Sequence, residues 1–343
     1  MTPRLEWDAD TDSAQRAARV VALRGLDAVV SARDRIRRRD TESVHEFRVA
    51  LRRLRSWMRA YRPSLNDTVQ KRTRRRLSTI AHATTGLRDL DVQIEWLRDE
   101  RKALGDARLE AAKWILQSLK TDRKRAWRQF TKILRRDYQE TEDALRDELT
   151  RYVVTRDIRT SEQVSGMRPV TAHLLQQQAD KLAAAFEKIR SADDTKRLHQ
   201  ARIVAKRTRY VLEPLATQTS KLTSIADDLA RFQDIVGELR DAQLLAHRIT
   251  HEVTSIAAER TALVASELVY RPAGVMDFSR IVTESPFDAS LSLLFARIRD
   301  RISAASRAAS AALDPQASRR LVAEIESARE ARIHSRPGAR IHT

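Results

Sequence analysis

The chain of 343 residues contains no cysteine. A disulfide framework and thiolate metal chemistry are therefore both excluded, and with them a secreted disulfide scaffold. No apolar run approaches the roughly 18 residues that a membrane span needs. The first ten residues carry acidic and polar side chains in place of the basic stretch and apolar core of a signal peptide. We therefore expect an unprocessed, soluble protein of the cytoplasm that makes no membrane contact.

Glycine and proline are also scarce, with 7 and 8 residues respectively, and strand signals are nearly absent. Alanine, leucine, arginine and glutamate dominate, which is the composition of long helices. Apolar residues recur at helical spacing, for example between Val44 and Tyr61. We predict an all-α fold of about eight to ten helices. The predicted breaks are Arg62-Pro63, Gly105, residues 166–169, residues 271–274, Ser285-Pro286 and Asp314-Pro315.

The charge balance is strongly basic, with 65 lysines and arginines against 47 acidic residues and a net charge of +18. This surplus favours a polyanionic partner. Of the basic residues 54 are arginine, whose planar guanidinium forms paired hydrogen bonds with phosphate oxygens. Arginine-rich codon usage is an alternative explanation of the high proportion of arginine among the basic residues, although it does not explain the net charge.

An internal repeat organises the sequence. Residues 44–55 align without gaps to residues 198–209, a shift of 154 positions, and residues 86–91 align to 238–243, a shift of 152. Two matches in the same order indicate duplication of a helical unit. We place the first bundle at about 5–155, the second at 168–330 and the linker at 154–169. Residues 331–343 are predicted to be a disordered basic tail.

One face of each repeated helix is basic. On a helix that turns 100° per residue, five side chains of the first copy lie in a sector about 80° wide around the helix axis. No carboxylate lies among them. We call them the first ridge: His45, Arg48, Arg52, Arg55 and Arg59. The matching second ridge is His199, Arg202, Lys206 and Arg209. Like charges at this spacing repel by a few tenths of a kcal/mol per pair, and the first ridge spans about 21 Å. A linear polyanion would offset the repulsion.

The pattern His-x-x-Arg-[Val/Ile]-x-x-[Arg/Lys]-Arg-x-Arg, followed by Leu-Arg-Asp, occurs twice and resembles the CHAD domain family. The resemblance covers residues 1–330 as a single domain. It implies two similar antiparallel four-helix bundles related by a pseudo-twofold, with a basic central pore. It also implies a non-enzymatic protein that binds inorganic polyphosphate and associates with polyphosphate granules.

The contacts that the resemblance implies lie on and beside the two ridges, and Arg59 joins them from the ridge geometry. In the first half they are His45, Arg48, Arg52, Arg53 and Arg55, and in the second half His199, Arg202, Lys206, Arg207 and Arg209, with Arg88 and Arg240 as further candidates. We expect no catalytic residue, no metal and no cofactor. The sequence gives no indication of the oligomeric state.

Several alternatives stay open. Asp89 and Asp91 could hold magnesium in a phosphate-processing enzyme, although the second copy has Gln243 in place of Asp91. His247 and His251 have a spacing that suits zinc on a helix, but no third ligand is evident.

Two alternatives concern the ridges themselves. Their arginines could form a structural network with carboxylates such as Asp89, Asp91 or Asp241. Sequence-independent binding of nucleic acid also fits the charge, although the ridges hold few aromatic residues for stacking on bases. Pro214 follows the second ridge, and we expect it to end or kink that helix early.

Overall fold

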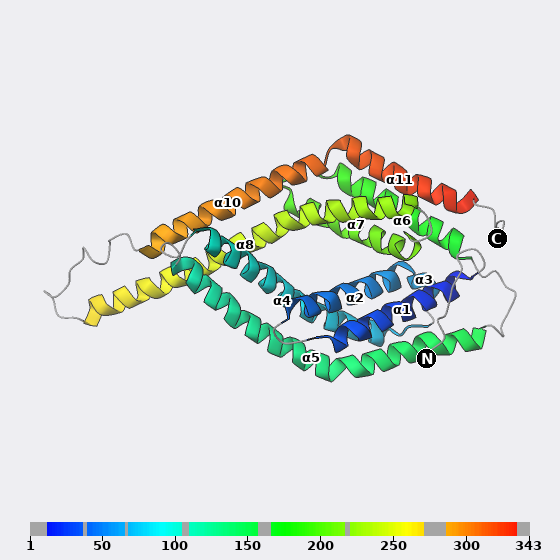
Figure 1. Ribbon diagram of the computed structural model, residues 1–343, viewed down its shortest axis with the longest axis horizontal. Helices are drawn as coiled ribbons and strands as arrows, with labels where there is room; N and C mark the ends of the chain where they lie inside the picture. The colour runs from blue at the N-terminus through cyan, green and yellow to red at the C-terminus, as the bar shows by residue number, and fades with distance from the viewer. Residues whose placement is uncertain are drawn as a thin grey trace. The chain divides into compact units, whose positions relative to one another are not determined.

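The computed structural model describes residues 12–36, 40–65, 68–104, 110–156, 166–216, 220–270 and 286–334, and these residues are almost entirely helical (Figure 1). Within these ranges the only β interaction is an isolated bridge between Ser13 and Gly166. The predicted all-α class is confirmed. The helices are α1 (Ala14–Asp34), α2 (Thr41–Ala60), α3 (Arg62–Leu65), α4 (Lys71–Leu104), α5 (Glu110–Arg156), α6 (Met167–Glu187), α7 (Thr195–Ala216), α8 (Ser220–Tyr270), α10 (Pro286–Ala312) and α11 (Pro315–His334).

Several predicted breaks coincide with helix starts. Helices α10 and α11 begin at Pro286 and Pro315, where the missing N–H of proline leaves no intrahelical bond unmade. Helix α11 ends at His334, so the first residues of the predicted tail are helical. Residues 335–343 and the breaks at Gly105 and 271–274 lie outside the described residues.

The second ridge helix does not end at Pro214, because α7 continues to Ala216, and a kink at this proline stays a prediction. Proline removes one hydrogen bond near the end of the helix. Buried side chains along α7, among them Ala201, Ala205 and Leu212, hold the helix in place.

The chain forms two compact units. The first comprises Met1–Arg88, Ala126–Val236 and Ala309–Thr343, and the second comprises Asp89–Arg125 and Gly237–Ala308. Each unit takes segments from both halves of the sequence, and long helices such as α4 and α5 contribute one part to each. The compact units therefore do not follow the repeat. The predicted bundles at 5–155 and 168–330, and the pseudo-twofold between them, stay predictions.

The first unit is held together by α2, which packs on α1 through a buried face. Trp57 of α2 donates a hydrogen bond from Nε1 to the carbonyl oxygen of Ala18, at 3.0 Å. The hydroxyls of Tyr61 and Thr171 lie 2.8 Å apart, which ties the end of α2 to α6. Helix α6 in turn packs on α7 and on α11, which lies beside it in Figure 1. These contacts fix the orientation of α2 and α7.

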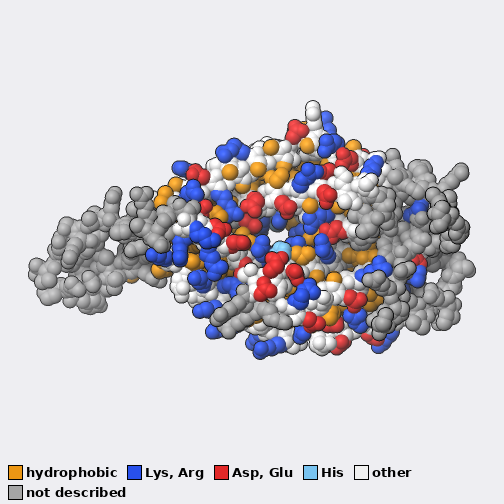
Figure 2. All heavy atoms as spheres, viewed as in Figure 1, with side chains coloured by type: hydrophobic (Ala, Val, Ile, Leu, Met, Phe, Trp, Pro, Cys, Tyr) orange, Lys and Arg blue, Asp and Glu red, His pale blue; other side chains and the backbone are white. Residues whose placement is uncertain are grey.

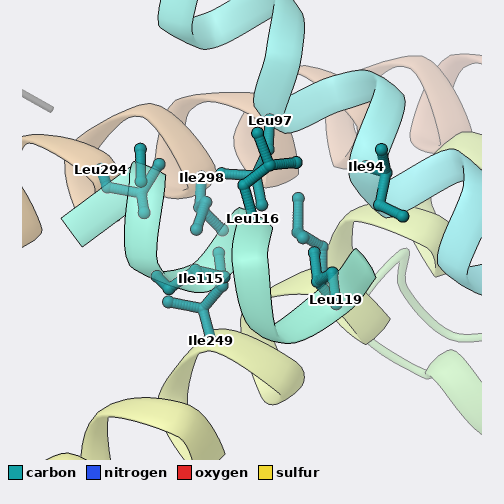
Figure 3. Packing of buried hydrophobic residues seen from close by; sticks show 10 residues of the cluster. Ile94, Leu97, Ile115, Leu116, Leu119, Ile249, Leu294 and Ile298 are labelled. Atoms are coloured by element: carbon teal, nitrogen blue, oxygen red, sulfur yellow. The ribbon is translucent and has the colours of Figure 1, made fainter. Parts of the chain in front are cut away.

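The second unit has its own apolar core, shown in Figure 3. Leucine and isoleucine side chains from parts of α4, α5, α8 and α10 point toward one another there. Its buried members are Ile94, Leu97, Ala112, Ile115, Leu116, Leu119, Leu245, Ile249, Leu294 and Ile298. Among the described residues, no helix is both long enough and apolar enough to cross a membrane.

Candidate anion-binding site

Helix α2 holds the first ridge beside its buried face. The helix is capped by Asp40, whose side chain accepts a hydrogen bond from the Glu42 backbone N–H at 3.0 Å. Phe47 and Leu51 are fully buried and orient the helix toward the core. Because the ridge flanks this face, its first four members are half-buried, whereas Arg59 is exposed.

Helix α7 presents the second ridge in the same way. Its N-terminus is capped by Asp194, whose side chain accepts from the Arg197 backbone N–H at 3.3 Å. Leu198, Ala201 and Ala205 form the buried face, so the four members of the second ridge are half-buried. Helices α2 and α7 both belong to the first unit and pack against each other. The fold therefore brings the two ridges together.

Lys206 marks the place where the ridges meet. Its pKa is lowered to about 8, first by burial and then by the positive charges of Arg202, Arg52, Arg48 and Arg207. Arg48 and Arg52 belong to α2, so cations of both helices act on this one amine. Within the described part of the chain, Lys206 forms no ion pair. Because this pKa lies above 7, most of the lysine is charged at neutral pH, although burial and the neighbouring cations disfavour the charged form.

His45 lies in a similar environment at the start of the first ridge. Its Nδ1 atom is buried and has no hydrogen-bond partner within the described residues. Burial lowers its pKa, and the charges of Arg88, Arg52 and Arg48 lower it further, whereas Glu42 opposes the shift. Arg88, at the end of the first segment of the first unit, is thus a close electrostatic neighbour of His45 in the first ridge.

Several ridge arginines are oriented by neutral groups. The guanidinium carbon of Arg52 lies 5.7 Å from the ring centroid of Tyr210. Arg55 donates from Nη2 to the Ser78 hydroxyl at 2.8 Å. Arg202 donates from Nε to the carbonyl oxygen of Gln233 at 2.9 Å. Neutral partners fix the direction of a guanidinium and leave its net charge in place. The sequence alone does not indicate Tyr210, Ser78 or Gln233, because their roles depend on packing between helices.

A carboxylate of α7 pairs with two of the predicted contacts, as the alternative of a structural ion pair allows. Glu213 of α7 lies 3.0 Å from Nε of Arg53 and 3.3 Å from Nε of Arg209. A sequence signal existed, because Glu213 follows Arg209 by four residues, the spacing of a helical ion pair. Asp91 pairs instead with Arg123, at 2.5 Å.

The remaining predicted residues reach the surface of the molecule. Arg207 reaches the surface, but its guanidinium is partly desolvated, and this desolvation and the charge of Arg59 lower its pKa. Arg240 is exposed and belongs to the second unit, so its part in the site stays a prediction. His247 and His251 are exposed, and no group of three potential metal-ligating side chains occurs in the described ranges.

Arginines elsewhere on the surface have a different environment. Arg136 donates to Asp137, and this hydrogen bond raises the pKa of Arg136. Arg297 likewise donates to Glu100, with the same effect on its pKa. Figure 2 shows basic and acidic side chains interspersed over one face of the molecule. Around Lys206, by contrast, the neighbouring charges that shift its pKa are all positive.

The ion pair of Asp91 and Arg123 supplies a test of the magnesium alternative. Asp91 is 6% exposed, so Asp91→Asn removes the charge of one close ion-pair partner from a largely buried guanidinium. We expect the free energy of unfolding to fall by about 3 kcal/mol, with anion binding unchanged. Chemical denaturation and a polyphosphate binding assay measure the two quantities. An unchanged stability would contradict a structural role for this aspartate.

The comparisons with known proteins agree with this helical arrangement. The profile described as the CHAD domain matches residues 21–250 of the chain. The chain belongs to the CHAD domain family. This confirms the predicted family, and the match includes both basic ridges. No curated protein matches the sequence.

Two solved structures show the same fold as this CHAD-family chain. The CHAD domain from the plant Ricinus communis is 19% identical, with a TM-score of 0.61, and the match covers 84% of this chain and 94% of that one. PptA from Streptomyces chartreusis is 16% identical, with a TM-score of 0.52, and the match covers 88% of this chain and 96% of that one. At these identities the likeness concerns the fold alone.

Proposed function

We propose that this CHAD-family protein binds inorganic polyphosphate, without cleaving it, along the facing ridges of α2 and α7. The observation that carries the proposal is the environment of Lys206, whose pKa is lowered to about 8 by burial and by four surrounding arginines. Such a cluster disfavours its own folding, and a bound polyanion would offset the cost. In a cell that stores polyphosphate granules, this binding would bring the protein to the granule surface.

The form of the ridges supports a linear ligand. Cations at one-turn spacing follow the helix axis for about 21 Å on α2, which suits consecutive phosphates better than a single one. Arg52 and Arg55 are held by a tyrosine ring and a hydroxyl, so part of their side-chain entropy is already lost before a ligand arrives. Guanidinium groups oriented in this way favour phosphate oxygens over diffuse counterions.

Binding without catalysis is also part of the proposal. The enzyme alternative depends on Asp89 and Asp91 acting together on a metal-bound phosphate. Asp91 is instead engaged by Arg123 in the second unit, whereas the basic ridges belong to the first unit. This favours a structural role for Asp91.

Nucleic acid is the competing ligand. Proteins that bind single strands without sequence preference usually stack bases on exposed aromatic rings. Tyr210 is an aromatic residue beside the ridges, but it is 2% exposed, and Arg52 and Arg209 lie against its ring. This ring is not available to a base, which favours a ligand of phosphates alone.

Competition at fixed ionic strength tests the proposal. Labelled polyphosphate is bound to the full chain, and unlabelled polyphosphate or duplex DNA is added at equal phosphate concentration. We expect polyphosphate to displace the label at a concentration at least tenfold lower than duplex DNA does. Equal displacement by DNA would contradict the proposal and favour the nucleic-acid alternative. Both ligands lose affinity with salt, so salt dependence alone does not separate them.

A further inference from the structure

The two ends of the α2–α7 contact are electrostatically different. The repeat shift of 154 relates Arg53 to Arg207 and Arg59 to position 213, which is a glutamate. The neighbouring pair Arg53 and Glu213 therefore corresponds, through the repeat, to the neighbouring pair Arg207 and Arg59. At one end of the contact these two positions hold an arginine and a glutamate, which attract each other. At the other end they hold two arginines, which repel each other.

At the first end Glu213 neutralises two cations. Its Oε2 atom lies 3.0 Å from Arg53 on α2, and its Oε1 atom lies 3.3 Å from Arg209 on its own helix. Both arginines already have an anionic partner, so a phosphate that approaches them meets the negative charge of Glu213. The carboxylate is half-buried, so bulk water screens it only in part.

At the second end Arg59 of α2 lies one helical turn after Arg55 and is the charged neighbour of Arg207 of α7. The pKa of Arg55 is lowered by burial and by the charge of Arg59, and the pKa of Arg207 is lowered by the same two causes. Arg55, Arg59 and Arg207 form no ion pair within the part of the chain that the structure describes. Arg59 is exposed, and Arg207, although partly desolvated, also reaches the surface, so an anion reaches both without rearrangement of the core.

We propose that Arg55, Arg59 and Arg207 form the open anion subsite of this surface, and that Glu213 closes the opposite end by occupying the place of a phosphate between Arg53 and Arg209. The inference rests on the proposed binding of polyphosphate. It adds an order of binding. Phosphates bind first to Arg55, Arg59 and Arg207, and they reach Arg53 and Arg209 only by displacing Glu213. Glu213 is thus a residue that limits affinity.

Three variants test this order of binding. Glu213→Gln removes the competing charge, and we expect three- to tenfold tighter binding of long polyphosphate, with a salt dependence steeper by about one charge. Arg59→Glu would pair the new carboxylate with Arg207 and close the open end, and we expect roughly tenfold weaker binding. The double exchange Arg59→Glu with Glu213→Arg moves the acid to the other end at constant net charge. Its affinity should lie within about threefold of the unaltered protein.

The control is Glu46→Gln, which changes the net charge by the same amount. Glu46 pairs with Arg35, which belongs to neither ridge. We expect less than a twofold change in affinity. Tighter binding by Glu46→Gln equal to that of Glu213→Gln would mean that net charge alone acts, and would overturn the inference.

Two further outcomes separate the inference from the proposed function. If Glu213→Gln lowers the melting temperature and leaves affinity and salt slope unchanged, Glu213 is a structural clamp between α2 and α7, and the inference fails while polyphosphate binding stands. If the unaltered protein does not bind polyphosphate in the same assay, the proposed function itself fails.

Discussion

Replacing Arg48 and Arg202 together by glutamate is expected to weaken polyphosphate binding by at least about a hundredfold. The two positions are equivalent in the repeat, one on each helix, and both act electrostatically on Lys206. Each substitution removes a charge-assisted phosphate contact, worth about 1.5–3 kcal/mol, and adds a repulsive carboxylate. Fluorescence anisotropy with labelled polyphosphate at fixed salt measures the loss.

A matched control separates the loss of ridge contacts from the change in net charge. Arg75 and Arg319 are exposed, lie on α4 and α11, and belong to neither ridge. Their joint replacement by glutamate changes the net charge equally, and we expect affinity to fall by less than about threefold. Circular dichroism should show unchanged helix content in both variants. Equal losses in the two variants would place the ligand outside the ridges.

Replacing Lys206 by methionine is expected to stabilise the free protein while weakening polyphosphate binding. The pKa of Lys206 falls from its ordinary value of 10.5 to about 8 on folding, a cost of about 3 kcal/mol for the charged form. Below pH 8 the lysine is charged in both states and the fold bears the full cost, which disappears as pH rises toward 10.5. At pH 7 we therefore expect Lys206→Met to raise the melting temperature by roughly 5 °C.

The affinity should depend on pH through the same residue. A bound polyanion would raise the pKa of Lys206 back toward 10.5, so binding takes up a proton wherever the free lysine is neutral. Because the free pKa is about 8, we expect affinity to fall roughly tenfold between pH 7.5 and 9.5. This fall should be absent in Lys206→Met.

The control for both effects is Lys181→Met. Lys181 is an exposed residue of α6 in the same unit. We expect its replacement to change neither the melting temperature nor the pH profile. Scanning calorimetry and binding titrations at several pH values measure both effects. A lower melting temperature for Lys206→Met, together with an unchanged pH profile, would contradict the electrostatic role of this lysine.

The helices and the ridges could be read from the sequence because both depend on local periodicity. The apolar positions of α2, such as Phe47 and Leu51, are buried as the 3.6-residue spacing predicts. That spacing also placed His45 and Arg52 at the edge of the buried face, where they are half-buried. The repeat indicated an equivalent ridge on α7. These features need only the geometry of a single helix.

The other features of the structure depend on which helices pack against each other. The sequence did not predict compact units that cross the repeat, because long helices such as α4 and α5 contribute to both units. It also did not predict that Tyr210 lies beneath Arg52, or that Glu213 pairs with Arg53 of another helix. Periodicity gives the face of a residue, whereas its neighbours across a helix interface follow from tertiary packing.

A crystal structure of the full chain with polyphosphate bound would test the central claim most directly. We predict consecutive phosphates along the contact of α2 and α7, with oxygen atoms within hydrogen-bond distance of Arg52 and Lys206. Phosphates bound only to other faces of the molecule, with the side chains of both ridges unmoved and out of reach, would contradict it.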